Sequence, residues 1–340
     1  MNISFPWIPL CTALAGCLLS PARSHALVNI DFVTVGDPGN APDQAYDEPA
    51  FGSVGYVYSI GKFEVSLHEY TAFLNAVAAT DPFNVFWNSQ METDLNIAGI
   101  SRSGSDGSFS YSVIGDGNRP VSYVSWYDAA RFVNWLHNGQ PIGAQGAGTT
   151  ETGAYNLVDF DPDGSNFLKS ADARYWIPSE DEWYKAAYYD PSASGPEDDY
   201  WLYPTRSDSL PGNQIGAGAN QANFYDGDYS VTQSPSNDSS QNYLTPGGSY
   251  SASASYYGTF DQGGNVLEWT DEEERFLMHT RGGSWDREEH IMRASVYGTS
   301  ERYDKLPGYG FRVATVPEPA MAGLLMVGSL LLMCQRKRAF

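Results

Sequence analysis

The alternation of apolar and polar positions predicts a few short strands and three helices. Residues 28–33 and 56–64 alternate with a period of two, which is typical of half-buried strands. The spacing becomes helical at Ser66, and Glu69 completes the sequence form of a capping box, so a helix is expected to begin there. The apolar face of this helix would hold Tyr70, Phe73, Leu74 and Val77.

Two more helices are predicted further along the chain. The first covers 125–137 and is followed by Gly139 and Pro141, residue types that commonly follow a helix end. The second covers 180–188, with Ser179 as its N-cap.

The segments between these helices are long and polar. Residues 81–118 are rich in Gly and Ser, with a short alternating stretch at 109–113. The segment 190–255 is unusually long for a loop inside one domain, so we expect a metal ion or aromatic packing to organise it. No short repeat and no Pro-rich linker divides the chain, and residues 27–315 are therefore predicted to form a single domain.

Composition narrows the possible functions. Hydrophobic residues make up 42% of the 340 residues, enough for a sizeable core, and the 14% of aromatic residues and 34 glycines favour a loop-rich domain. The net charge of −22 argues against a nucleic-acid partner, because phosphates would be repelled. Acidity suits calcium, whose ligands are oxygens, but it also keeps an exported protein soluble, and we assign most of the charge to solubility.

Both ends of the chain are predicted to be targeting segments. Residues 1–26 have an apolar run followed by small residues at a cleavage-site position, which indicates a signal peptide for signal peptidase. A buried N-terminal helix is the alternative. Residues 316–340 contain Pro317-Glu318-Pro319, an apolar run at 320–334 and the basic cluster Arg336-Lys337-Arg338.

This C-terminal order resembles the PEP-CTERM sorting signal of exported proteins in Gram-negative bacteria. The resemblance implies transient membrane anchoring through 320–334 and cleavage by an exosortase, often in species that make exopolysaccharide. As a helix the run would span only about 22 Å, which is short for a full bilayer crossing. An ordinary C-terminal anchor is the alternative.

The cysteines all lie in these two end segments. They are Cys11, Cys17 and Cys334. The domain between the ends is therefore predicted to have no disulfide, no thiolate metal site and no cysteine nucleophile.

Four stretches of the central domain carry distinctive motifs. They are residues 63–75, residues 119–136, residues 175–187 and residues 258–313, the last with Gly264-Asn265-Val266-Leu267-Glu268-Trp269, Arg281-Gly282-Gly283-Ser284-Trp285 and Gly310-Phe311-Arg312-Val313. In this order they resemble the formylglycine-generating enzyme family, also called the sulfatase-modifying factor domain. The resemblance covers about residues 50–315. It implies a single α+β domain, a loop-rich variant of the C-type lectin-like fold.

The residue types in these motifs also have structural explanations. The tryptophans are expected to be core rings, and Glu180 and Glu182 to stabilise the start of a helix. Arg281 and Arg312 are expected to pair with buried acids, because a guanidinium offers several donors in a fixed plane.

The resemblance implies a structural calcium at the Gly-rich turn. Its ligands would be the carbonyls of Gly263, Gly264 and Val266 and the side chain of Glu268. Such a turn can direct carbonyls inward while one carboxylate supplies charge. The alternative is a tight turn in which Glu268 caps a backbone group or forms a salt bridge.

A second calcium is implied in the loop before this turn. Asn223 and the Phe224 carbonyl match the start of that site, and Asp238 is assigned as its acid, with Asp226 and Asp228 as rivals.

The chemistry of the family enzyme does not carry over. That enzyme uses two redox-active cysteines just after the Gly-Gly-Ser motif, and residues 286–292 contain none. His290 and Met292 alone make a poor copper site, so copper is not expected. The iron-dependent branch of the family uses a histidine-rich triad, and no His-x-Glu pair occurs among the histidines of the central domain.

Three functions therefore remain open. We favour an exported, non-catalytic binding or structural module at the cell surface, with polysaccharide as a candidate partner. The second is an enzyme of divergent chemistry, using acids and tyrosines such as Tyr297 or Tyr303. The third is a diversifiable lectin-fold binding protein.

Overall fold

The computed structural model describes residues 27–45, 50–81, 84–158, 168–192, 194–196 and 198–317. The signal peptide predicted at 1–26 and nearly all of the sorting segment predicted at 316–340 lie outside these residues. Within them, no helix is long and apolar enough to cross a bilayer.

Four helices occur in the described residues, and three of them confirm the predicted ones. They are α1 (Leu67–Val77), α2 (Gln90–Thr93), α3 (Trp126–His137) and α4 (Glu180–Tyr188). Ser66, Ser125 and Ser179 each accept a hydrogen bond from the third residue of their helix, whose side chain in turn accepts from the cap N–H. These reciprocal bonds satisfy backbone donors that a helix start leaves free, which explains why α1, α3 and α4 begin where they do.

The first sheet joins the two ends of the domain. Its strands are β1 (Phe32–Val35), β2 (Tyr58–Gly61), β10 (Ala314–Thr315) and β5 (Tyr175–Trp176), all antiparallel, in the order β1-β2-β10-β5. The alternating stretches therefore form β1 and β2, although β1 begins later than predicted.

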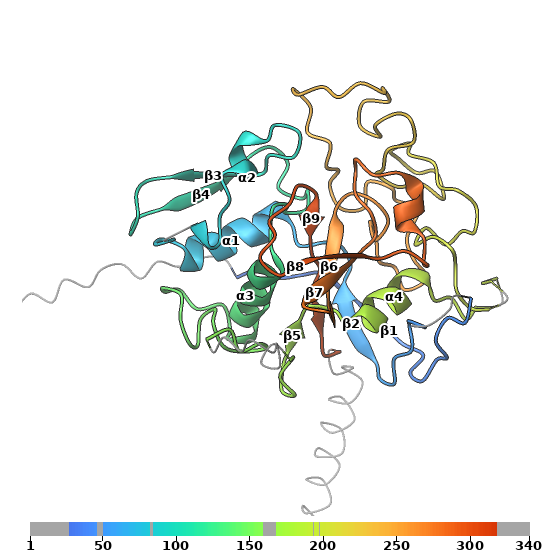
Figure 1. Ribbon diagram of the computed structural model, residues 1–340, viewed down its shortest axis with the longest axis horizontal. Coiled ribbons are helices and arrows are strands. Elements are labelled where there is room, and N and C mark those ends of the chain that lie inside the picture. Colours follow the sequence, from blue (N-terminus) through green and yellow to red (C-terminus); the bar gives the residue numbers. More distant parts are fainter. Residues whose placement is uncertain are drawn as a thin grey trace, which may run out of the picture.

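Two other sheets are described. The hairpin of β3 (Ile100–Ser103) and β4 (Ser110–Val113) includes the alternating stretch predicted there. A four-stranded sheet has the order β8-β7-β6-β9, with β8 (Gly298–Glu301), β7 (Leu277–Arg281), β6 (Leu267–Glu274) and β9 (Tyr309–Gly310). In Figure 1, β6 and β7 lie near the middle of the molecule, with α1 and α3 on one side and α4 on the other.

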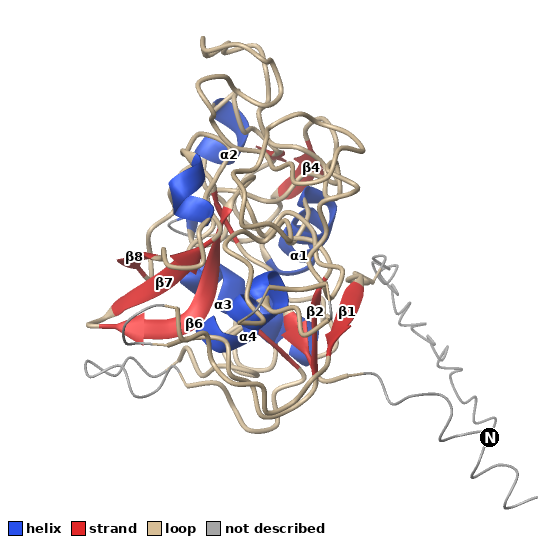
Figure 2. Ribbon diagram, turned by 90° about the vertical axis from the view of Figure 1, so that its right-hand side faces the viewer, coloured by secondary structure: helices blue, strands red, loops and turns tan. Residues whose placement is uncertain are grey.

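Loops make up most of the molecule, as Figure 2 shows. The segment 190–255 forms only isolated bridges among its described residues. Its tyrosines pack against one another and against Trp285, so aromatic packing, one of the two predicted possibilities, helps to organise it. This loop-rich α+β architecture agrees with the fold expected from the resemblance.

The main core is an aromatic cluster between α1 and α3. Phe73 is fully buried, and its ring lies 5.4–5.5 Å from the rings of Tyr70, Phe86, Phe132 and Trp135. These centroid separations suit edge-to-face and tilted packing, which adds to the hydrophobic stabilisation of the burial itself.

Replacement of this central ring tests the packing. Phe73→Ala should lower the free energy of unfolding by about 3–5 kcal/mol, because it leaves a cavity among four rings. Phe276→Ala makes the same substitution at a side chain that is 62% exposed, and it should change stability by less than about 0.5 kcal/mol. Urea denaturation of both variants measures the difference, and equal losses would contradict the assignment of Phe73 to the core.

Candidate functional site

The Gly-rich turn ends in a buried ion pair. Glu268 on β6 and Arg312 have fully buried side chains, and Arg312 Nε and Nη2 each lie 2.5 Å from a Glu268 carboxylate oxygen. Trp183 Nε1 of α4 donates to the same carboxylate at 2.7 Å. Arg312 also donates to the carbonyls of Gly61 and Phe260. Burial opposes the charge on Arg312, but Glu268 raises its pKa above the ordinary value.

Two further carboxylates lie near this ion pair. Burial raises the pKa of Glu64 well above its usual range, and the charges of Asp261 and Glu268 add to the shift. Burial also raises the pKa of Asp261 to about 6. The hydrogen bond from Gly248 N–H and the charge of Arg312 lower this pKa, whereas the charge of Glu268 raises it further. The local charge is therefore sensitive to pH.

Asn265 connects these acids to the neighbouring loop. Its Nδ2 donates to Glu64 Oε1 at 3.1 Å, and its Oδ1 accepts from Asn223 Nδ2 at 3.0 Å and from Thr245 N at 3.0 Å. Asn265 has a positive φ of 60°, which asparagine tolerates better than most residues. Glu64 also lines a cavity of about 220 Å³ together with Asp31 and Glu69.

Asn223, the first residue of the second predicted calcium site, lies against Gly264 of the first predicted site. Gly264 has a φ of 79°, and a Cβ there would lie 2.1 Å from the Asn223 carbonyl oxygen, so only glycine fits. Phe224 follows Asn223, and its carbonyl oxygen lies 3.5 Å from Asn213 Nδ2.

The acid assigned to the second site has other hydrogen-bond partners. The Asp238 carboxylate accepts from Ser240, and its backbone N–H donates to the Tyr243 hydroxyl. Asn223 instead donates to the Tyr243 carbonyl, at the opposite end of that residue. Among the described residues, no hydrogen bond joins the Asp238 side chain to Asn223, and the assignment of Asp238 stays a prediction.

The contacts of the Glu268 carboxylate bear on its predicted role as a calcium ligand. Calcium needs oxygens whose charge and lone pairs are available to it. Both oxygens of Glu268 face Arg312, so a calcium ion would have to share this carboxylate with the guanidinium. The geometry matches the salt-bridge alternative, and the calcium assignment to Gly263, Gly264, Val266 and Glu268 stays a prediction.

The predicted ion pair of the other arginine is also present. Arg281 on β7 is buried and pairs with Glu180 of α4, whose pKa is lowered by Arg281 and His279 against the effect of burial. Tyr297 stacks on His279 with a centroid distance of 4.4 Å, whereas Tyr303 is 67% exposed. Glu180 and Glu182 thus have the structural roles expected of them at the start of α4.

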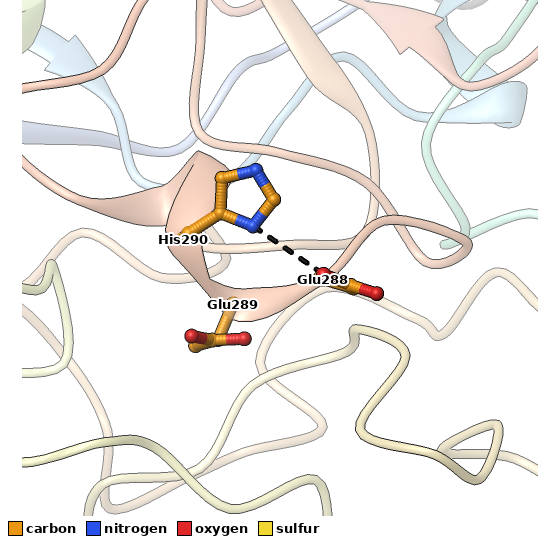
Figure 3. A group of neighbouring side chains, drawn as sticks. All are labelled: Glu288, Glu289 and His290. Atoms are coloured by element: carbon orange, nitrogen blue, oxygen red, sulfur yellow. Dashed lines mark ion pairs between the residues drawn. The ribbon is translucent and has the colours of Figure 1, made fainter.

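The segment after Gly-Gly-Ser is the one in which the family resemblance implies two cysteines. The ligand atoms of Glu288, Glu289 and His290 lie within 4.8 Å of one another (Figure 3). Glu288 and His290 are largely exposed, and nothing further marks these three as a metal site. Met292 is buried with Tyr203 and Phe224, so its sulfur lies in the protein interior while the His290 ring lies at the surface.

A ladder of four aromatic rings lies beside this segment. Tyr225 and Tyr229 are 4.8 Å apart, Tyr229 and Tyr243 are 4.8 Å apart, and Tyr243 stacks on Trp285 at 4.9 Å and 14°. Tyr225 and Tyr229 are half-buried, whereas Tyr243 and Trp285 are buried. Sequence reasoning missed this ring ladder, for which the tyrosines in the 190–255 loop were the available signal.

The backbone holds the ladder next to the Gly-Gly-Ser turn. Tyr225 N–H donates to the Arg287 carbonyl at 2.9 Å, and Trp285 N–H donates to the Asn265 carbonyl at 3.0 Å. Ser284 Oγ donates to Asp286 Oδ1 at 2.6 Å. Polar groups and aromatic faces thus lie together at this surface, an arrangement common in binding sites.

Known structures share this architecture. The crystal structure of CarF aligns with 86% of this chain and 100% of its own, at 18% identity and a TM-score of 0.53. Treponema denticola variable protein 1 (87% and 98% covered, 16% identity, TM-score 0.44) and PvdO from Pseudomonas aeruginosa (85% and 92% covered, 18% identity, TM-score 0.43) also match. At these identities the likeness concerns the fold alone.

The fold defines a loop-rich α+β domain of the formylglycine-generating-enzyme type within the C-type lectin-like class. The family model of the sulfatase-modifying factor enzyme 1-like domain matches residues 35–316, so the chain belongs to that family. No curated protein matches it in sequence.

Removing one charge of the buried pair tests its role. Glu268→Gln should lower the free energy of unfolding by about 3–5 kcal/mol, because Arg312 stays buried without its carboxylate. The double variant Glu268→Met/Arg312→Met should lose less, since neither charge remains. Urea denaturation in calcium and in excess chelator measures wild type and both variants. A calcium-dependent stabilisation that Glu268→Gln abolishes would support the predicted calcium site, and identical stability in the two conditions would contradict it.

The raised pKa of Asp261 predicts a pH dependence. The folded pKa is about 6 against about 3.9 unfolded, so its stabilising contribution is complete below pH about 4 and is lost as pH rises through about 6. Asp261→Asn stays neutral and should be more stable than wild type above pH about 6. Unfolding free energies across this range should diverge with rising pH, and parallel curves would contradict the assignment. Exposed Asp106→Asn is the control.

Proposed function

We propose that this protein is an exported cell-surface protein whose family domain is a non-catalytic binding module for polysaccharide. The observation behind the loss of catalysis is the position of the cysteines, which are Cys11, Cys17 and Cys334. The segment 286–292 has carboxylates and a guanidinium instead. These groups cannot replace the soft thiolates that bind Cu(I) and exchange with a substrate thiol.

The proposal includes processing at both ends. Signal peptidase would remove 1–26, and an exosortase would act at the segment 316–340 after transient membrane anchoring through 320–334. The order of the Pro-Glu-Pro triplet, apolar run and basic cluster supports this step.

The ring ladder supports a binding role. Tyrosine and tryptophan bury large apolar faces while keeping a polar edge, which suits sugars, whose rings have apolar C–H faces and hydroxyl rims. Tyr225 and Tyr229 are partly exposed and come from a long loop, and Trp285 fixes the inner end of the ladder. Loops on a rigid scaffold are where binding residues usually concentrate.

Hydroxyl and carboxylate groups beside the rings could orient a sugar. Ser284 and Asp286 form a hydrogen-bonded pair, and the Tyr123 hydroxyl donates to Asp94 Oδ2 at 2.5 Å. Tyr123 has a positive φ of 61°, a strained conformation for a bulky residue, and such strain clusters at functional sites.

A ring-removal experiment tests this function. Tyr225→Ala should weaken binding of the domain to polysaccharide by about tenfold, because it removes the outer stacking face while leaving the buried rings in place. Tyr256→Ala removes a tyrosine that is 37% exposed and packs on Tyr257 instead, and it should bind like wild type. Glycan-array and calorimetric measurements on folded variants give the comparison.

Three results would contradict the proposal. The first is equal binding by the two variants, and the second is no binding to any polysaccharide. The third is oxidation of a Cys-containing sulfatase peptide by the domain with added copper, which would show that the family chemistry survives without cysteines.

A further inference from the structure

Carboxylate residues neighbour the ladder residues in sequence, and two of them are exposed. Asp226 and Asp228 lie between Tyr225 and Tyr229 in the chain, and Asp226 is exposed. Asp286 is exposed and directly follows Trp285. A ligand that stacks on the outer rings would therefore meet negative charge on both loops that form the ladder.

A fourth carboxylate lies near Asp286. Asp94 accepts the Tyr123 hydroxyl bond, and burial, Asp94 and Asp286 all raise the pKa of Tyr123. The charges of Asp94 and Asp286 therefore act on the same phenol. The half-buried Asp94 belongs to a different part of the chain from the ladder, so the acidic character of this surface does not come from one loop alone.

Positive charge on this surface is sparse. Arg287 is exposed, and its carbonyl accepts from Tyr225 N–H. His290, the next basic side chain along the segment, lies 3.6 Å from Glu288. The segment 286–292 contains one arginine and three carboxylates, and the whole chain has a net charge of −22. The local field therefore repels anions and attracts cations.

The inner end of the ladder has an unused donor. Trp285 is 7% exposed, and among the described residues its Nε1–H is a buried donor without a hydrogen-bond partner. Buried donors without partners are uncommon in folded proteins and are often explained by an additional ligand or water.

We propose that the ring ladder selects a cationic glycan, a polysaccharide of amino sugars with free amines; this inference rests on the binding function proposed above. Sugar rings stack on Tyr225 and Tyr229 while their ammonium groups pair with Asp286 and Asp226. Uronic-acid or sulfated polysaccharides are repelled by the same carboxylates. Neutral glycans keep the stacking contact but lose the ion pairs.

Three oligosaccharides of equal length separate these possibilities. Fully deacetylated glucosamine oligomers, N-acetylglucosamine oligomers and oligogalacturonate are titrated into the domain by calorimetry at pH about 5, where the amines are charged and the pH is still above the ordinary Asp pKa of about 3.9. We expect the deacetylated oligomer to bind most tightly and the oligogalacturonate not to bind. Raising the salt concentration should weaken the binding of the deacetylated oligomer only, because the electrostatic screening length falls from about 8 Å at physiological salt to about 3 Å at 1 M.

A matched pair of variants assigns the effect to the ladder. Asp286→Asn keeps an acceptor for Ser284 and should weaken binding of the deacetylated oligomer by about two- to fivefold, and binding of the acetylated oligomer less, because only the ion pair is lost. Asp106→Asn removes an exposed carboxylate at the turn between β3 and β4, and it should leave both affinities unchanged. An equal loss in both variants would attribute the preference to net charge alone and overturn the assignment to this surface.

Other outcomes distinguish this inference from the function on which it rests. If the acetylated oligomer binds as tightly as the deacetylated one, or oligogalacturonate binds, the cationic preference is wrong while glycan binding stands. If none of the three oligomers binds and polysaccharides fail as well, both proposals fall.

Discussion

The ion pair between Glu268 and Arg312 connects the parts of this loop-rich fold. Arg312 lies between β9 and β10 and donates to the Gly61 carbonyl at the end of β2, while Glu268 belongs to β6. Trp183 adds α4 to the same carboxylate. Two sheets and a helix therefore meet at one fully desolvated contact. Such a contact is costly to form but more costly to break on one side, so the elements around it are fixed together.

The same contact influences the local chemistry. Glu64 and Asp261 lie close enough to feel both charges, and burial raises the pKa of each acid. One guanidinium cannot balance three ionised carboxylates in a buried region, which agrees with the raised pKa of Glu64 and of Asp261. A metal ion could also balance this charge, but it would have to share with Arg312 the carboxylate of Glu268, which the family resemblance assigns to that role.

Local signals in the sequence predicted local structure well. The capping boxes at Ser66, Ser125 and Ser179 depend only on residues three positions apart, and the helices begin where those residues indicate. The sheet of β6, β7 and β8 gave no clear signal, because the outer half of β6 is acidic and its pairing is set by tertiary contacts. The sequence alone could not decide whether Glu268 is a calcium ligand or forms a salt bridge, because its partner Arg312 lies 44 positions away.

The ring ladder depends on a similar long-range arrangement. Its tyrosines belong to a polar loop that has no sequence periodicity, and Trp285 belongs to a family motif in which a core ring was expected. Only the fold shows that the two stack, because the Asn265 carbonyl places Trp285 at the inner end of the ladder. Asn265 also bonds to Glu64 in the buried centre. The rigid ion-paired interior and the aromatic surface are therefore one continuous structure. A surface built in this way can hold its rings in place before a ligand arrives, which lowers the entropic cost of binding.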